Sequence, residues 1–274
     1  MNTIGFVGGG NMATSIIGGL VASGFTAENI FVTDLDGSKL EKLQADFGIT
    51  PLQDNSDLVS KASSIVLSVK PQVFQPVLKQ MQPAVQQHKP LVISIAAGIR
   101  EKEISRWLGG ELAIVRTMPN TPALVQAGVT GMYANSLVTQ QQKGFANDVL
   151  SAVGSTVWLD EETQLDAVTA ISGSGPAYFF LVMEAMENAA KELGVNEQQA
   201  RELVLQTAFG AAKIATQSED SPTILREKVT SPGGTTEQGV LALENGGVRE
   251  AFSAALKAAQ NRSVELGDIL GEDA

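Results

Sequence analysis

The stretch that decides the fold is Ile4-Gly5-Phe6-Val7-Gly8-Gly9-Gly10-Asn11-Met12-Ala13, near the start of the chain. A short apolar run leads into a Gly-x-Gly-x-x-Ala turn, and helical spacing follows that turn. This order predicts a strand, a tight turn and a helix whose free N–H groups can face a phosphate. Gly8 permits the turn, Gly10 lets the backbone approach a pyrophosphate, and Ala13 lets the helix pack closely on the sheet. The alternative is an ordinary glycine-rich turn between packed elements.

Short apolar runs alternate with helical stretches from this turn to about residue 160. Such alternation is typical of parallel βαβ units, and it predicts an α/β domain with a Rossmann-type, doubly wound parallel sheet. We expect strands at residues 4–7, 30–33, 64–69, 91–95 and 112–115, and helices at 12–23, 38–47, 74–85 and 102–108. Two more strands are expected at 129–133 and 155–159, with a helix at 140–153 between them.

Strand patterns end after Asp160, and helical periodicity continues almost to the last residue, with helices expected at 166–171, 177–193, 197–218, 223–229, 235–245 and 248–266. The chain thus divides into a dinucleotide-binding domain, residues 1–160, and an all-α domain, residues 161–274. The stretch Pro176–Leu193 is apolar on too many sides for one surface stripe, so we expect a partner subunit to bury it. The alternative is the central helix of a monomeric bundle.

The composition restricts the class of partner. Among 274 residues there are 19 Lys plus Arg and 30 Asp plus Glu, so the net charge is −11. Such a surface repels phosphate backbones and anionic lipids, and we expect neither a nucleic-acid nor a membrane partner.

The absence of cysteine excludes disulfides, thiolate catalysis and cysteine-ligated metal centres, and no metal site is expected. Apolar runs such as Leu91–Ile99 are too short to span a bilayer, and residues 1–5 lack a signal-peptide pattern, so we expect a cytoplasmic protein.

The single histidine, His88, lies in the polar stretch Gln86–Pro90 between two expected elements. We interpret it as a solvated loop residue and not as a catalytic group. Dehydrogenases that act on alcohols need a positioned acid or base, which is often histidine, and this chain offers none.

An acidic residue, Asp34, follows the second expected strand. In this position a carboxylate accepts hydrogen bonds from the adenosine ribose and repels a 2′-phosphate, so NAD is favoured slightly over NADP. NADP use stays open, because Asp34 could rotate away and Ser38 or Lys39 could then reach the phosphate.

Five separated motifs carry a resemblance to a known family. They are Ser68-Val69-Lys70-Pro71, Ser94-Ile95-Ala96-Ala97-Gly98, Arg116-Thr117-Met118-Pro119-Asn120-Thr121-Pro122, Ser172-Gly173-Ser174-Gly175-Pro176-Ala177-Tyr178 and Ser231-Pro232-Gly233-Gly234-Thr235-Thr236. In this order, and over essentially the whole chain, they resemble the pyrroline-5-carboxylate reductases. The resemblance implies hydride transfer from NADH or NADPH to the cyclic imine of 1-pyrroline-5-carboxylate, which yields L-proline. It also implies a homodimer formed through the helical domain, and it leaves open a larger ring of dimers.

The last motif, Ser231 to Thr236, directly precedes an expected helix. Free backbone N–H groups and threonine hydroxyls therefore gather at the positive end of the helix, where they can hold a carboxylate. The alternative is an ordinary helix start with Ser231 or Thr235 as its cap. That alternative explains one hydroxyl but neither the glycine pair nor the second threonine.

The resemblance also assigns roles to single residues. It implies that Thr236, the candidate catalytic residue, hydrogen-bonds the ring nitrogen of the substrate, and that Ser231, Gly233, Gly234 and Thr235 hold its carboxylate. The residues that it places along the cofactor are Val7, Gly8, Gly9, Gly10, Asn11, Met12, Asp34, Asn55, Ser68, Val69, Lys70, Pro71, Ile95, Ala96 and Ala97, with Met118, Pro119, Asn120 and Thr121 near the nicotinamide.

Two other classes of protein would share the predicted fold, and two other residues are candidate proton donors. In a β-hydroxyacid dehydrogenase we expect a lysine on the helix after the Gly173-Ser174-Gly175 turn, and here no lysine occurs before Lys191. A non-catalytic dinucleotide-binding protein would share the fold, but the paired threonines argue against it. Lys70 suits a phosphate contact or a turn better than proton transfer, and Glu219 suits a solvated turn better than a proton donor.

Overall fold

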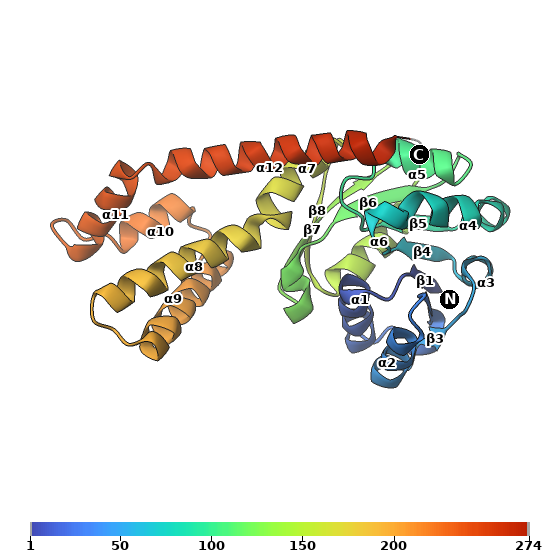
Figure 1. Cartoon of the computed structure of the whole chain (residues 1–274), viewed down its shortest axis with the longest axis horizontal. Helices are drawn as coiled ribbons and strands as arrows, with labels where there is room; N and C mark the ends of the chain where they lie inside the picture. The colour runs from blue at the N-terminus through green and yellow to red at the C-terminus, as the bar shows by residue number, and fades with distance from the viewer. Residues whose placement is uncertain (1, 273–274) are drawn as a thin grey trace. The chain divides into compact units, whose positions relative to one another are not determined.

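The computed structural model describes residues 2–272, which form two compact units (Figure 1). The sheet unit comprises the described residues up to Ser174 together with those from Ala258 onward, and the helical unit comprises Gly175–Lys257. Packing therefore joins residues 161–174 to the sheet. The division of the chain into domains after residue 160 stays a prediction.

The sheet unit contains eight strands in the order β3-β2-β1-β4-β5-β6-β7-β8. The sheet is parallel from β3 through β6, whereas β7 pairs antiparallel with β6 and β8 runs parallel to β7. The expected doubly wound α/β fold is confirmed, with the last two strands reversed because residues 119–127 are too few for a crossover. The strands are β1 (Ile4–Val7), β2 (Ile30–Thr33), β3 (Thr50–Pro51), β4 (Ser64–Leu67), β5 (Leu91–Ser94), β6 (Ile114–Met118), β7 (Gly128–Ala134) and β8 (Gly154–Trp158).

Helices cover both faces of this sheet, and each face has its own core. Alternate residues of β1 point to opposite sides, so that Phe6 packs in one core and Val7 in the other. The first core lies under α1 (Asn11–Ala22), α2 (Gly37–Phe47) and α6 (Gln140–Ser151). The second lies under α3 (Asn55–Lys61), α4 (Phe74–His88) and α5 (Glu101–Trp107). His88 is exposed in the last turn of α4, and thus ends a helix where a loop was expected.

Short helical segments connect the strands. They are η1 (Ala27–Asn29), η2 (Pro71–Val73) and η3 (Thr121–Val125). After β8 the chain forms α7 (Gln164–Val168) and then η4, a π-helical turn over Thr169–Gly173. The expected glycine-rich turn at Gly173 is therefore helical, and α8 begins at Gly175 without an intervening loop.

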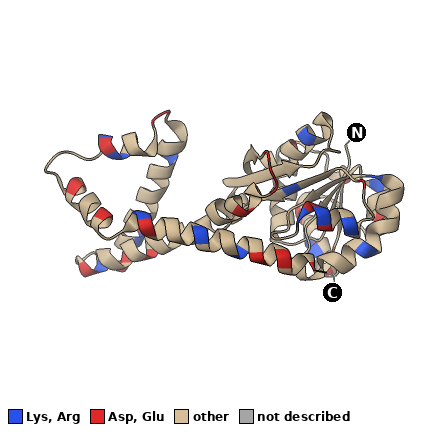
Figure 2. Cartoon of the chain, turned by 90° about the horizontal axis from the view of Figure 1, so that it is seen from above, with Lys and Arg blue, Asp and Glu red and all other residues tan. Residues whose placement is uncertain are grey.

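The helical unit consists only of helices and their connections, as expected. It contains α8 (Gly175–Glu192), α9 (Glu197–Gln217), α10 (Pro222–Lys228), α11 (Thr235–Asn245) and the start of α12 (Val248–Gly271). Several large apolar side chains are exposed on α8 and α9, among them Phe179, Phe180, Leu203 and Phe209 at 61–67%. Figure 2 shows acidic and basic residues interspersed along the helices.

The helical stretch Gln164–Glu192 is long and apolar enough to cross a membrane by length and composition alone, with a mean hydropathy of 1.2 in its most apolar window. A single stretch of this kind is weak evidence for a span, because interface helices of globular proteins meet the same criterion.

Candidate active site

The predicted cofactor residues gather at one edge of the sheet. Val7, Ser68, Ile95 and Met118 lie at or just after the carboxyl ends of β1, β4, β5 and β6, which are neighbours in the sheet. The strand order reverses between β1 and β4, since the chain continues to β2 on one side and to β5 on the other. In open α/β sheets ligands bind at such a switch point.

The glycine loop after β1 has the geometry that a pyrophosphate needs. Gly8 has φ +102°, and an added Cβ would lie 2.9 Å from the carbonyl oxygen of Ser68. The Ser68 hydroxyl donates to the carbonyl oxygens of Val7 (2.9 Å) and Gly8 (2.7 Å), which fixes the turn. Gly10 is the N-cap of α1 with no side-chain cap, and an added Cβ there would meet nothing within 4 Å. The loop thus fits a dinucleotide, with the N-terminus of α1 open to a phosphate.

The Asp34 carboxylate lies against this loop. Its Oδ2 accepts a hydrogen bond from the Gly9 N–H at 2.8 Å, and its Oδ1 accepts one from the Asp36 N–H at 2.9 Å. Lys39 Nζ lies 3.6 Å from Oδ1 and is half exposed. Each carboxylate oxygen keeps a lone pair for a ribose hydroxyl, while Lys39 is close enough to approach a 2′-phosphate. Nearby, Asn55 accepts a 2.6 Å hydrogen bond from the Thr33 hydroxyl.

The other predicted cofactor residues differ in what their side chains can reach. Lys70 is exposed and makes no ion pair with a residue in the described range 2–272, and Ala97 is exposed beside buried Ala96. Asn120 is buried and engaged inside the protein, since its amide donates to the Ser172 carbonyl oxygen at 3.1 Å and accepts from the Val129 N–H at 2.9 Å. Asn120 thus braces the loop after β6.

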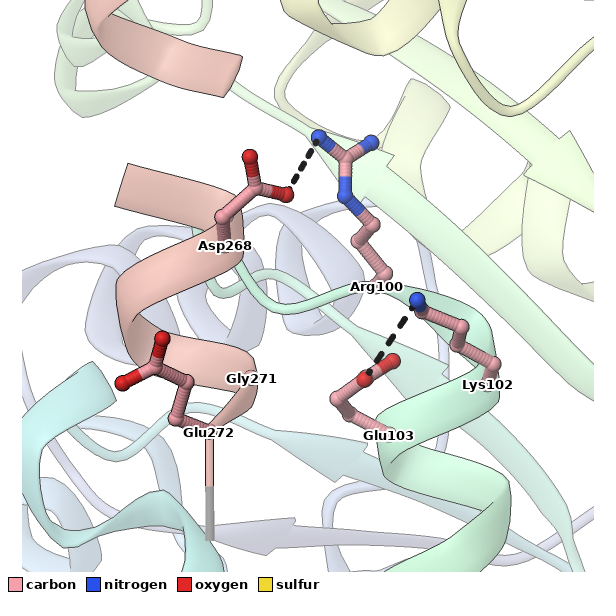
Figure 3. Close-up of a pocket in the computed structure, with 7 residues that line it drawn as sticks. Arg100, Lys102, Glu103, Asp268, Gly271 and Glu272 are labelled. Atoms are coloured by element: carbon pink, nitrogen blue, oxygen red, sulfur yellow. Dashed lines mark ion pairs between the residues drawn. The ribbon is translucent and has the colours of Figure 1, made fainter. Parts of the chain in front are cut away.

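A cavity of about 210 Å³ lies between the start of α5 and the C-terminal end of α12 (Figure 3). Gly267 and Gly271 face Arg100 and Glu103 there, because a Cβ added to either glycine would come within about 3.1 Å of those side chains. None of the residues that line the cavity belongs to the predicted dinucleotide site. Within residues 2–272, no cluster of three or more His, Asp or Glu could hold a metal ion.

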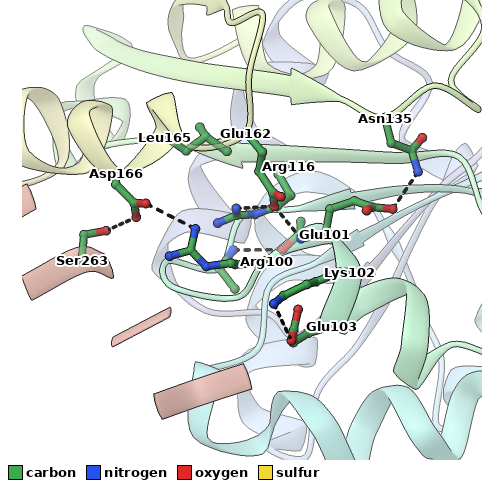
Figure 4. A network of polar contacts seen from close by, with 12 residues as sticks. Arg100, Glu101, Lys102, Glu103, Arg116, Asn135, Glu162, Leu165, Asp166 and Ser263 are labelled. Atoms are coloured by element: carbon green, nitrogen blue, oxygen red, sulfur yellow. Dashed lines mark hydrogen bonds and ion pairs between the residues drawn. The ribbon is translucent and has the colours of Figure 1, made fainter. Parts of the chain in front are cut away.

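A buried polar network connects β6, α5, α7 and α12 (Figure 4). Arg116 Nη1 donates to Glu162 Oε1 at 2.5 Å, and the same oxygen accepts the Glu101 N–H. Asp166 on α7 pairs with Arg100 at 3.4 Å and accepts a 2.7 Å hydrogen bond from the Ser263 hydroxyl on α12. Burial lowers the pKa of the Arg116 guanidinium, and the charge of Glu162 opposes this shift. Arg116 belongs to a motif in the sequence, but no sequence pattern indicates its partner Glu162, 46 positions away.

The predicted carboxylate cradle lies in the helical unit, between α10 and α11. The N-cap of α11 is Gly234, with no side-chain cap, so the alternative of a helix capped by Ser231 or Thr235 is wrong. The Gly234 N–H donates to the Ser231 carbonyl oxygen at 2.9 Å, and Gly233 has φ +73°. Within residues 2–272, the hydroxyls of Ser231, Thr235 and Thr236 and the N–H groups of both threonines have no hydrogen-bond partner. These donors are free for an anion.

A glycine loop at the switch point of a doubly wound sheet indicates a dinucleotide-dependent oxidoreductase, and the free donors at the start of α11 suit an anionic substrate. The model for "Pyrroline-5-carboxylate reductase dimerisation" matches residues 162–266, and that for "NADP oxidoreductase coenzyme F420-dependent" matches residues 3–98. The pyrroline-5-carboxylate reductase of Pseudomonas aeruginosa is 46% identical over 269 residues, 98% of each chain. This chain therefore belongs to the pyrroline-5-carboxylate reductase family, and the resemblance drawn from its motifs is confirmed.

Two solved structures extend the comparison. A pyrroline-5-carboxylate reductase from Coxiella burnetii is 44% identical with a TM-score of 0.94, over 97% of this chain and 98% of that one. The pyrroline carboxylate reductase of Plasmodium falciparum, solved with NADP bound, is 29% identical with a TM-score of 0.84 over the same shares. The alternative of a β-hydroxyacid dehydrogenase is left without support, since Lys191 in the last turn is the only lysine of α8.

Proposed function

We propose that this protein reduces 1-pyrroline-5-carboxylate to L-proline, with NADH or NADPH as the hydride donor. The observation that carries the proposal is the start of α11, where two threonine N–H groups and three hydroxyls have no hydrogen-bond partner among residues 2–272 at the positive end of a helix. This donor set suits a small carboxylate. Family membership makes the cyclic imino acid the substrate.

The substrate carboxylate binds at Ser231, Gly233, Gly234 and Thr235 in this proposal. A helix N-terminus favours a negative charge, and the glycines leave room for the carboxylate to approach the backbone. The Thr236 hydroxyl then hydrogen-bonds the ring nitrogen, which fixes the face of the C=N bond that is presented for reduction.

The proton on the ring nitrogen comes from solvent. A cyclic imine binds a proton readily, and the resulting iminium carbon accepts a hydride without a general acid from the protein. The positions of two candidate proton donors support a proton from solvent. His88 is exposed at the end of α4, and Glu219 is an exposed residue that follows α9. Catalysis then consists mainly of positioning.

The glycine loop and Asp34 would hold the dinucleotide, with the N-terminus of α1 available to its pyrophosphate and Asp34 to its adenosine ribose. A reduced nicotinamide, when bound, supplies the hydride. The residues after β4, β5 and β6 complete the site, with Met118 and Thr121 on the nicotinamide side. Asp34 favours NADH slightly, and Lys39, 3.6 Å from it, keeps NADPH acceptable.

The working form is a homodimer built through the helical unit. Its support is the exposed apolar surface of α8 and α9, which a partner subunit would remove from water, and the residues matched by the family's dimerisation model. Dimers join into a larger ring in this proposal. The protein acts in the cytoplasm on a small molecule, with no nucleic-acid or membrane partner, in agreement with its net charge of −11.

One assay tests the reaction. The cyclic imino acid is added to the protein with NADH or with NADPH, and the loss of reduced-nicotinamide absorbance is followed while L-proline is measured by chromatography. Stoichiometric oxidation of a coenzyme and formation of L-proline are expected. Absence of L-proline with both coenzymes would refute the proposed function.

A further inference from the structure

The start of α11 carries a feature that the proposed reaction does not use. Glu237, in the first turn of the helix, reaches back so that its Oε2 accepts a 2.8 Å hydrogen bond from the Gly233 N–H. Gly233 is one of the residues assigned to the carboxylate of the substrate. A carboxylate of the protein itself therefore occupies one donor of the carboxylate cradle.

The negative charge of Glu237 has no counterion within residues 2–272. Two cations of the neighbouring helices pair with other carboxylates, since Lys228 binds Asp220 and Arg249 binds Glu244 with a 2.6 Å contact. The hydrogen bond from Arg249 lowers the pKa of the Glu244 carboxyl, and the charge of Arg226 adds to this shift. Glu237 thus lies beside the loop with the Gly233 N–H as its hydrogen-bond partner.

Two carboxylates compete for the same end of the helix. The positive end of α11 is a favourable place for one negative charge, and a second charge a few Å away is repelled by the first. The N–H groups of Thr235 and Thr236 stay free, whereas that of Gly233 becomes available only when Glu237 moves away. The hydrogen bond also holds Gly233 at φ +73°, so the group that repels the ligand also orders the loop.

We infer that Glu237 is a further positioning residue that weakens carboxylate binding at the cradle and thereby speeds release of the product. The inference rests on the proposed function, because the substrate and the product are both small carboxylates held at this loop. A cradle with one internal carboxylate binds imino acid and product less tightly than a neutral one. Turnover is then less inhibited by accumulated L-proline.

The test separates the charge of Glu237 from its hydrogen bond. Glu237→Gln keeps an acceptor for the Gly233 N–H and removes the charge, whereas Glu237→Ala removes both. Glu202→Gln on α9 is exposed and makes the same change of charge away from the loop. For each protein we would measure kcat, the KM values for the imino acid and NADH, inhibition by L-proline, and the Kd of L-proline by calorimetry.

The expected result is that Glu237→Gln lowers the KM for the imino acid and the Kd for L-proline by about three- to tenfold, the size of one charge effect in water. The KM for NADH is unchanged, as are all the constants of Glu202→Gln. Glu237→Ala gains less affinity and loses turnover, because its loop is less ordered. A Glu237→Gln protein that binds L-proline no better than the wild type would overturn the inference. A wild type that forms no L-proline refutes the proposed function instead, and the two failures are therefore distinct.

Discussion

Gly9 and Asp34 are joined by a 2.8 Å hydrogen bond from the backbone N–H to Oδ2, which ties the carboxylate after β2 to the glycine loop after β1. The carboxylate proposed to select the coenzyme thus also supports the loop proposed to hold the pyrophosphate. A substitution at Asp34 changes the charge beside the ribose and the order of the loop together, and a pair of variants is needed to separate the two effects.

Asp34→Ser should raise the ratio of kcat/KM for NADPH to that for NADH, because it removes the charge that repels a 2′-phosphate while Lys39 stays in place. Asp34→Asn keeps an acceptor for the Gly9 N–H and removes the same charge, so it should shift the ratio in the same direction with a smaller loss of overall activity. Asp148→Ser, on an exposed face of α6, is the control for net charge. An unchanged ratio in both variants would show that Asp34 does not discriminate between the coenzymes.

The glycines of the loop should respond differently to an added side chain. Gly10→Val should fold normally, since an added Cβ meets nothing within 4 Å and the backbone there is extended, with φ −73°. It should nevertheless lose coenzyme binding, because the new side chain would fill the place proposed for the pyrophosphate.

Gly8→Ala should instead destabilise the fold by about 1–3 kcal/mol, since it forces φ +102° on alanine and brings its Cβ to 2.9 Å from the carbonyl oxygen of Ser68. Thermal unfolding and fluorescence titration with NADH distinguish the two losses, and tight NADH binding by Gly10→Val would refute the site.

Thr236→Ala should lower kcat/KM for the imino acid. The loss should correspond to about 1–3 kcal/mol of transition-state stabilisation, the value of one hydrogen bond to a charged group. The affinity for NADH should not change, since Thr236 belongs to the first turn of α11, which is proposed to bind the substrate, and not to the glycine loop. Thr236→Ser keeps the hydroxyl and should recover most of the activity. Steady-state kinetics of both variants decide the matter, and wild-type kcat/KM in Thr236→Ala would remove Thr236 from its role.

The main elements of the fold could be predicted because their apolar patterns are local. The run Ile4–Val7 is a buried strand in the structure, with the bounds that its pattern predicts. The short elements β3 and α3 escaped prediction, because α3 buries little more than Leu58 and Val59 and lacks a long periodic face. Its only strong signal is Asp54, which caps the N–H groups of Ser56 and Asp57. Periodicity also carries no information on direction, and the reversal of β7 was therefore missed.

The candidate site could be predicted where its residues are close in sequence, as in the glycine loop and in Ser231 to Thr236. Contacts between distant residues could not be predicted. Arg116 and Glu162 are 46 positions apart, and Asp166 and Ser263 are 97 apart, so no spacing rule links them. Glu237 was missed although an acid in the first turn after a helix start is a known capping signal.

Phe180→Glu should dissociate the proposed dimer. Phe180 is 64% exposed on α8. In the proposed interface a glutamate at this position would be a buried, unpaired carboxylate, whose desolvation destabilises the dimer. Gln199→Glu adds the same charge at an exposed polar position of α9 and should leave the mass unchanged. Sedimentation velocity measures both. A Phe180→Glu protein that keeps the mass of a dimer would place the interface elsewhere.

Glu162→Ala should destabilise the sheet unit strongly. The side chain of Arg116 is 8% exposed, and its pKa is already lowered by burial, so removal of Glu162 leaves a buried charge without its partner. It also leaves the Glu101 N–H without its acceptor. Loss of one member of a buried pair costs about 3–5 kcal/mol, and we expect this decrease in the free energy of unfolding.

Arg249→Ala is the control, because it breaks the exposed pair with Glu244 and should leave the free energy of unfolding nearly unchanged. Urea unfolding at neutral pH, followed by the fluorescence of Trp107 and Trp158, reports on this unit because both tryptophans belong to it. The double variant Arg116→Met, Glu162→Leu should be more stable than Glu162→Ala, since it leaves no unpaired charge; equal stability of the single variant and the wild type would mean that Arg116 finds another partner or water.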